Sequence, residues 1–158
     1  MRVKVSLPTD NDYELMHEWR NHPRIRLASR SAEFITYEEH QIWLKKVMFD
    51  PLVCLFMFCV GKNRVGVGRL DIHGVHAEFS IYLNPEYIGK GLGLLCMKEL
   101  LRFSFSRQGL VTIYGETFAT NISARKTFEK AGLELLQQEG ETKFVSYGIS
   151  KKTWIRNN

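Results

Sequence analysis

Three strand-like segments separated by very short turns occupy the middle of the chain, and the first of them is a continuous apolar run. They run from Leu52 to Val60, from Arg64 to Ile72 and from Val75 to Leu83. Gly61-Lys62-Asn63 forms the first turn and Gly74 lies in the second, and connections this short join only antiparallel neighbours. The sequence therefore predicts a three-stranded antiparallel meander at the centre of the fold.

Helices and strands alternate on either side of this meander. Capping residues, proline breaks and the period of the apolar residues indicate where each element begins and ends. The predicted elements are a strand over Val3–Leu7, a helix capped by Asp10 or Asn11 and ending near Trp19, a helix from Thr36 to about Phe49, a helix from about Gly91 to Arg107, a strand over Val111–Phe118, a helix from Asn121 to Ala131, and a hairpin of Leu133–Gln138 and Lys143–Ile149.

This order of elements predicts an α/β fold. A connection through a helix makes the strand Val111–Phe118 parallel to Val75–Leu83, whereas the meander is antiparallel. We therefore expect one mixed central β-sheet with helices on both faces. No repeat or linker divides the sequence, so we expect a single domain over residues 1–158.

The charge and composition of the chain limit its partners. The net charge is +5, but Lys and Arg are spread between Asp and Glu, which favours a small phosphorylated ligand over nucleic acid. No stretch approaches the roughly 20 apolar residues of a membrane span, and no apolar signal segment is found, so we expect a cytoplasmic protein without membrane contact. The three cysteines match no zinc spacing, and His73 and His76 lack further close ligands, so we expect no metal.

Three glycines at alternate positions follow the last strand of the meander. Gly89, Gly91 and Gly93 stand at the start of a predicted helix, where glycine lets the backbone wrap closely around a ligand. Unpaired amides at a helix start carry the positive end of the dipole and suit a pyrophosphate. A dinucleotide fingerprint needs Gly where Leu94 stands, and a P-loop needs Ser or Thr directly after Gly89-Lys90. A glycine-rich turn without a ligand is the alternative interpretation.

The segment from Asn121 to Leu133 is the second informative stretch. Alone it is a helix capped by Asn121 and stopped by Gly132. Together with the glycine loop it resembles the GNAT superfamily of N-acetyltransferases, which has a loop of Gln or Arg followed by x-x-Gly-x-Gly or Ala, and later a helix of the form Asn-x-x-Ala-x-x-x-Tyr-x-Lys-x-Gly-Phe. The spacing between the stretches and the strand order match as well, so the resemblance covers nearly the whole chain.

The resemblance implies a GNAT fold in which the strands Val75–Leu83 and Val111–Phe118 splay apart and hold acetyl-CoA. Pantetheine is then expected in the gap, with a backbone amide near Leu83 polarising the thioester carbonyl. The acetyl group is expected to pass directly to a primary amine in a ternary complex. The residues expected to bind the coenzyme are Ile81, Leu83, Ile88, Gly89, Lys90, Gly91, Leu92, Gly93, Asn121, Arg125, Lys126 and Phe128.

An amine must lose a proton before it attacks, so the reaction needs a base or a chain of waters. Glu78, on the strand that leads into the splay, is the first candidate, with a surface carboxylate as the alternative; Glu116 on the opposite strand is the second. Ile88 stands where the family has Gln or Arg, and Phe128 stands where many relatives have the Tyr that protonates the departing thiolate. Tyr82, or water, is expected to take over that step.

The segment Trp19-Arg20-Asn21-His22-Pro23, with His40 further on, resembles a GNAT subgroup that acts on nucleotide-linked amino sugars, including the enzyme of the pseudaminic acid pathway. The resemblance implies that Trp19, Arg20, Asn21 and His22 bind such an acceptor, with Arg24, Arg26 and Arg30 available to a diphosphate. A core tryptophan beside solvated arginines is the alternative.

Other acceptors and functions stay open. A polyamine is disfavoured because the chain is basic, whereas a protein N-terminus is a second candidate acceptor. A catalytically silent acyl-CoA sensor would keep the loop and lack the base, and a nucleic-acid-binding module would need clustered basic and aromatic residues. The oligomeric state is expected to be a monomer or a homodimer.

Overall fold

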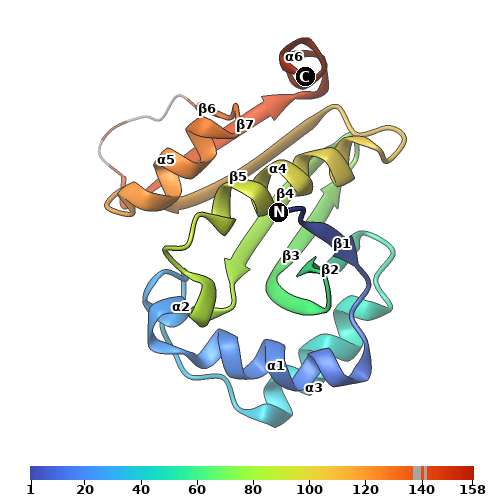
Figure 1. Cartoon of the computed structure of the whole chain (residues 1–158), viewed down its shortest axis with the longest axis vertical. Coiled ribbons are helices and arrows are strands. Elements are labelled where there is room, and N and C mark those ends of the chain that lie inside the picture. Colours follow the sequence, from blue (N-terminus) through green and yellow to red (C-terminus); the bar gives the residue numbers. More distant parts are fainter. Residues whose placement is uncertain (137–139, 141) are drawn as a thin grey trace.

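The computed structural model describes residues 1–136, 140 and 142–158, which form a mixed seven-stranded sheet between two layers of helices (Figure 1). The strand order is β1-β2-β3-β4-β5-β7-β6, and among the described strands only the pair β4 and β5 is parallel. The strands are β1 (Lys4–Ser6), β2 (Val53–Val60), β3 (Asn63–His73), β4 (His76–Leu83), β5 (Thr112–Phe118), β6 (Glu134–Leu135) and β7 (Phe144–Ser150). The helices are α1 (Asp10–Asn21), α2 (Pro23–Leu27), α3 (Tyr37–Met48), η1 (Pro85–Tyr87), α4 (Leu92–Phe105), α5 (Ile122–Lys130) and α6 (Lys151–Asn157). The predicted α/β class and mixed sheet are confirmed.

The predicted meander is present as β2, β3 and β4. Its strands pair antiparallel, with Val60 opposite Asn63 at the first turn and His73 opposite His76 at the second. Gly61 and Gly74 have positive φ values of 58° and 66°, which side chains rarely adopt, so glycine is required in both turns. The prediction succeeds because short turns leave a strand no other neighbour to pair with.

Several boundaries differ from the prediction. The cap of α1 is Thr9, not Asp10 or Asn11, because the Thr9 amide donates to the Asp12 carboxylate in a capping box (2.9 Å). The helices α2 and α6, of five and seven residues, were not predicted, since segments this short show little periodicity. Part of the predicted strand Leu133–Gln138 lies outside the described residues.

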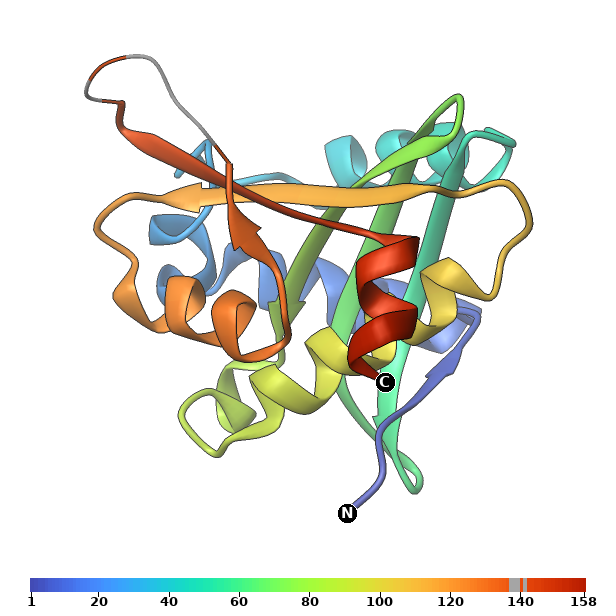
Figure 2. The same cartoon turned by 90° about the horizontal axis from the view of Figure 1, so that it is seen from above.

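The two helical layers cover different parts of the sheet (Figure 2). On one face α4, α5 and α6 pack on a large core that includes Phe56, Leu70 and Phe79. On the other face α1 and α3 form a smaller core with β2 and β3, joined by Tyr82 of β4. The helices α1 and α3 therefore leave β5 and β7 uncovered on their side of the sheet.

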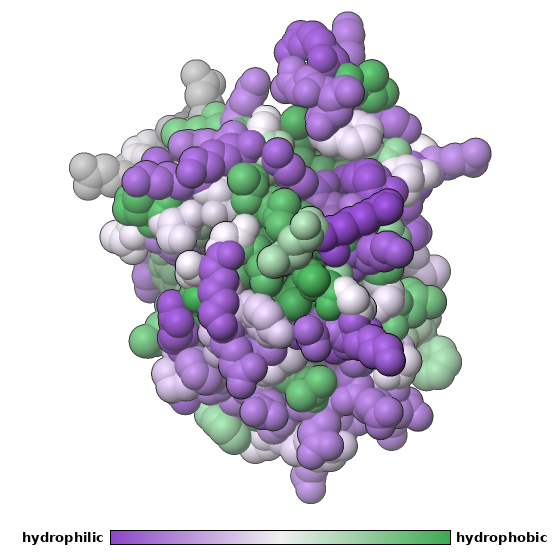
Figure 3. Space-filling view, in the orientation of Figure 1, coloured by the Kyte–Doolittle hydropathy of each residue, from purple (hydrophilic) through white to green (hydrophobic). Residues whose placement is uncertain are grey.

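The outer surface mixes polar and apolar residues. On the face in Figure 3, hydrophilic residues surround a smaller apolar area near the middle.

The free cysteines Cys59 and Cys96 are buried and Cys54 is partly buried, and burial raises the pKa of the Cys96 thiol to about 12. Among the described residues, no helix has the length and apolar character needed to cross a membrane.

A buried histidine lies between α1 and α3. His40 is 3% exposed, and its ring is 5.3 Å from that of His17 and 5.4 Å from that of Trp43. Burial, reinforced by His17 and Arg20, lowers the pKa of His40 to about 4. Its Nδ1 atom has no hydrogen-bond partner within the described residues, so His40 is a neutral core residue.

Replacing His40 by Leu should flatten the dependence of stability on pH. Between pH 6.5 and about 4, His40 binds a proton in the unfolded chain but not in the folded one. The free energy of unfolding therefore falls as the pH drops, with a slope of up to about 1.4 kcal/mol per pH unit from this one group. Urea unfolding at pH 7 and pH 5 measures the slope. His76→Leu, at an exposed turn, is the control and should keep the wild-type slope; an unchanged slope in His40→Leu would contradict this assignment.

Candidate active site

The strands β4 and β5 pair over only three residues and then diverge. His76, Ala77 and Glu78 pair with Thr112, Ile113 and Tyr114, although β4 continues to Leu83 and β5 to Phe118. The two strands separate visibly in Figure 2. The Phe79 ring packs against Gly115, where a Cβ atom would lie 2.6 Å from the ring. The predicted splay is therefore present, and its apex lies at Glu78 and Tyr114.

The backbone of β4 presents unpaired groups to this gap. The Asn84 amide donates to the Val65 carbonyl on the β3 side (2.9 Å). In an antiparallel ladder the bonded positions alternate, so even-numbered residues of β4 face β3, and Ile81 and Leu83 face β5. Their backbone groups have no partner within the described part of the chain, because pairing with β5 ends at Glu78. A ligand can bond there like an added strand.

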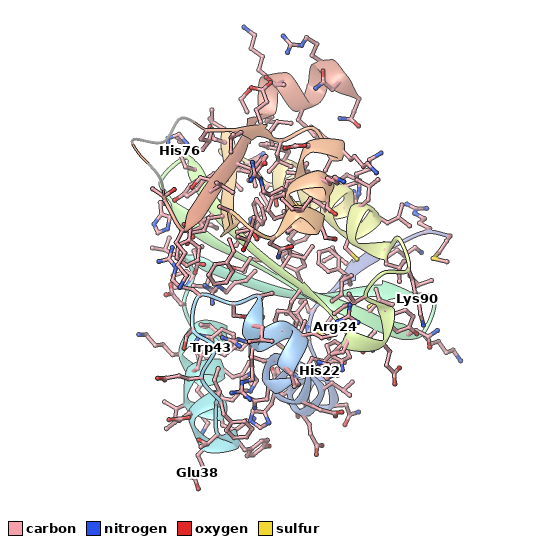
Figure 4. The ribbon with its side chains drawn as sticks, turned by 90° about the vertical axis from the view of Figure 1, so that its left-hand side faces the viewer. His22, Arg24, Glu38, Trp43, His76 and Lys90 are labelled. Carbon is pink, nitrogen blue, oxygen red and sulfur yellow. The ribbon has the colours of Figure 1, made fainter. Side chains whose placement is uncertain are left out.

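The amino end of α4 lies next to the far end of β4. Gly91 is its N-cap residue with φ 80°, Gly89 has φ 81°, and no side chain caps the helix. By contrast, the side chains of Thr36 and Asn121 cap α3 and α5 by accepting from first-turn amides. The amides that open α4 are thus free to bind an anion. Figure 4 shows Lys90 in this loop, far from His76 at the start of β4.

The remaining predicted coenzyme residues lie beside this loop. The side chain of Thr127 on α5 comes within 3.8 Å of a Cβ atom placed on Gly93, so α5 approaches α4 closely here. Arg125 Nε donates to the Tyr147 hydroxyl (3.1 Å) and its Nη1 donates to the Ala119 carbonyl (2.9 Å), whereas Lys126 is exposed. Arg125 therefore braces α5, whereas the exposed Lys126 is the freer of the two predicted cations.

Phe128 and Tyr82 are held in the fold in ways that their predicted roles did not include. Phe128 is 5% exposed and packs edge to face on Phe79 (5.2 Å). The Tyr82 hydroxyl donates to the Met16 carbonyl (3.3 Å), and burial raises the pKa of its phenol. Because this hydroxyl points to the α1 side of the sheet, away from α4, we correct the expectation that Tyr82 protonates the thiolate.

Acidic and basic side chains gather at the apex of the splay, on the face opposite α4. Glu78 and Tyr114 form the last pair between β4 and β5 before these strands diverge. Asp71 lies opposite Glu78 on β3. Asp71 pairs with Arg69 at 2.9 Å. Burial, with contributions from Glu78 and Asp71, raises the pKa of Tyr114 and keeps it a neutral phenol. These neighbours of Glu78 escaped sequence analysis because only the strand register brings them together.

A second ion pair crosses the open face. Arg30, from the segment between α2 and α3, pairs with Glu116 on β5, and its guanidinium lies 5.2 Å from the centre of the Phe144 ring. Phe144 stacks on Phe118 with ring centres 4.7 Å apart. Arg30 therefore tethers its segment over β5 and β7. The aromatic pair was also missed, since its members come from distant parts of the sequence.

The predicted acceptor residues divide between core and scaffold. Trp19 is 5% exposed in the smaller core, so its ring offers no open face for stacking. Asn21 exchanges two hydrogen bonds with the Ile35 backbone (2.7 and 2.8 Å), and His22 caps α2 through the Arg24 amide. Asn21 thus ties α1 to the segment before α3, and His22 holds the start of α2. Arg20 donates to the Ser31 carbonyl (3.2 Å), but its Nη1 is buried without a partner in the described residues.

A family model described as an acetyltransferase (GNAT) domain matches residues 2–134. The chain belongs to this family. The expected N-acetyltransferase activity and acetyl-CoA as cosubstrate are therefore confirmed.

Similar proteins support the predicted subgroup. The chain is 29% identical to acetyltransferase PseH of Campylobacter jejuni over 75% of this chain and 74% of that protein, which confirms the resemblance to the pseudaminic-type subgroup. The fold matches the crystal structure of Campylobacter jejuni PseH in complex with acetyl coenzyme A, with a TM-score of 0.74 at 22% identity over 94% of this chain and 99% of that one. It also matches spermidine N-acetyltransferase from Vibrio cholerae in complex with CoA and spermine, with a TM-score of 0.89 at 20% identity over 98% of both chains.

Replacing Gly91 by Ala should weaken acetyl-CoA binding beyond its effect on stability. The positive φ of 80° costs a side chain about 1–2 kcal/mol, and the strained turn is expected to move the amides that open α4. We expect the Kd for acetyl-CoA, measured by calorimetry, to rise by about tenfold or more, which is at least roughly 1.4 kcal/mol.

Gly74→Ala is the matched control for this substitution. Gly74 also has a positive φ (66°) with open space around it, but it lies in the β3–β4 turn. The control should lose similar stability in thermal unfolding and keep the wild-type Kd. Equal Kd values for the two variants would contradict the assignment of the glycine loop to the coenzyme site.

Proposed function

We propose that this GNAT enzyme acetylates the primary amine of a nucleotide-linked amino sugar by direct attack in a ternary complex. The observation that carries the proposal is an unpaired carboxylate at the apex of the splay, with arginine side chains around it on the face opposite α4. The coenzyme enters the gap from the α4 side and the acceptor from the α1 side, so that amine and thioester meet near Glu78.

Glu78 is the proposed base. Its carboxylate has no ion-pair partner among the described residues, whereas Glu116 is engaged by Arg30. An ion pair occupies the oxygens that a base needs in order to accept a proton. A free carboxylate at the apex also argues against a catalytically silent sensor, which has no need of a base.

The charges on the acceptor face favour an anionic acceptor over a polyamine. Among the described residues, two of its three carboxylates, Asp71 and Glu116, already pair with arginines. A polyamine needs several free carboxylates, and only Glu78 offers one.

The cationic and aromatic side chains over β5 and β7 suit the nucleotide part of such an acceptor. Arg30 lies over Phe144, and Lys143 lies 5.4 Å from the centre of the Phe118 ring. The Arg30 side chain is 71% exposed, so the outer side of its guanidinium is accessible. Cationic groups held on aromatic rings can stack on a base and pair with a phosphate. The similarity to PseH supports the same class of acceptor.

The test is release of coenzyme A from acetyl-CoA with a panel of UDP-linked amino sugars, N-terminal peptides and spermidine at equal concentrations. We expect turnover with an amino sugar. Turnover with peptides or spermidine alone would overturn the acceptor, and acetyl-CoA binding without turnover of any amine would favour the sensor.

Replacing Glu78 by Gln should slow acetyl transfer and spare coenzyme binding. Loss of a general base costs about 10²- to 10⁴-fold in kcat, and the loss should shrink at high pH, where more of the free amine is unprotonated. Glu116→Gln is the matched control and should keep kcat within about a factor of ten. A larger loss in Glu116→Gln than in Glu78→Gln would reverse the assignment of the base.

A further inference from the structure

Acetyl transfer from a thioester leaves a negative charge on sulfur. The amine nitrogen bonds to the carbonyl carbon, the C–S bond breaks, and its electron pair goes to sulfur. The nitrogen gives up a proton to the base or to water, and the thiolate takes one from solvent as coenzyme A departs. A hydrogen-bond donor held at the sulfur stabilises this charge while the bond breaks.

The hydroxyl groups near the gap on the coenzyme side are mostly engaged elsewhere. The Tyr147 hydroxyl donates to Glu129 Oε1 (2.8 Å) and accepts from Arg125. The Thr127 hydroxyl donates to the Ser123 carbonyl (2.9 Å). Phe128 carries no hydroxyl, and that of Tyr82 lies on the other face of the sheet. None of these groups is free to meet the sulfur.

Thr117 differs from these groups. It lies on β5 beyond the last residue paired with β4, and it faces α4 and α5 because it alternates with Glu116, which meets Arg30 on the opposite face. The residue is 8% exposed, and its hydroxyl has no hydrogen-bond partner within the described residues. The hydroxyl is not among the buried side-chain atoms that lack a partner, so it still reaches solvent and is accessible to an acceptor from a ligand.

The position of Thr117 across the gap fits that ligand. Glu78 is opposite Tyr114, so continuing the register by three residues places Ile81 opposite Thr117. The backbone of Ile81 faces the side from which β5 diverges. A coenzyme whose diphosphate binds at the amino end of α4 would extend its pantetheine arm past Ile81. Thr117 on β5 thus lies across from the backbone groups expected to bind that arm.

We propose that the Thr117 hydroxyl donates a hydrogen bond to the coenzyme sulfur and stabilises the thiolate that leaves. The inference rests on the acetyl transfer and on the proposed direct attack, but not on the identity of the acceptor. It assigns Thr117 the contact that Phe128 cannot make.

The first test needs no acceptor. The thiol of bound coenzyme A is titrated by thiolate absorbance in wild type, Thr117→Val and Thr117→Ser. The valine variant keeps the shape of threonine and removes the donor, so the pKa of the bound thiol should rise, whereas the serine variant should retain the wild-type value. Thr112→Val, on the opposite face of β5, is the matched control.

Kinetics give the second test. With an acceptor that turns over, Thr117→Val should lose about 10- to 100-fold in kcat, at or below the usual effect of one oxyanion donor, with the KM for acetyl-CoA nearly unchanged. Thermal unfolding of each variant checks that the fold is intact. If the pKa of the bound thiol in folded Thr117→Val equals the wild-type value, the proposal is overturned. It is also overturned if that pKa rises in Thr117→Ser as it does in Thr117→Val. Failure of every amino sugar would overturn the acceptor alone, because the thiol titration still decides Thr117.

Discussion

The loss of pairing between β4 and β5 beyond Glu78 is the constraint on which the site depends. Two parallel strands inside a sheet normally satisfy each other's backbone, yet here the Phe79 ring and Gly115 fill the point where the strands part. Ile81 and Leu83 consequently turn unpaired backbone groups toward the side from which β5 has diverged. The same divergence sets the far end of β4 beside the uncapped start of α4. An extended ligand that carries a diphosphate meets both features at once.

The sheet also separates two chemical tasks. One face, under α4 and α5, provides free amides, a lysine and the apolar floor built by Phe79 and Phe128. The other face collects carboxylates and arginines, because α1 and α3 leave β5 uncovered and the Arg30 segment crosses it. Among the described residues, β4 and β5 lose their pairing beyond Glu78, and there the two faces of the sheet come together. The proposed function uses this point: the coenzyme would approach from the α4 side and the acceptor from the α1 side.

Local patterns predicted the parts of the fold that local physics determines. The turns at Gly61 and Gly74 and the capped helix at Asn121 depend on residues close in sequence, and they were predicted well. The role of Trp19 could not be predicted, because the local sequence around a tryptophan at a helix end is the same whether the ring lies in a core or at a binding surface. Pairings such as Arg30 with Glu116 depend on register across the sheet. Thr117 became a candidate only when its face and the partners of competing hydroxyls were known.

Amide hydrogen exchange along β4, with and without saturating coenzyme A, tests the central claim most directly. The amides of Ser80 and Tyr82 face β3 and should be protected in both states. Those of Ile81 and Leu83 face the gap, so they should exchange rapidly in the free protein and become protected when the coenzyme arm fills it. Rapid exchange at Ile81 and Leu83 in the saturated protein, or full protection of both in the free protein, would contradict the account.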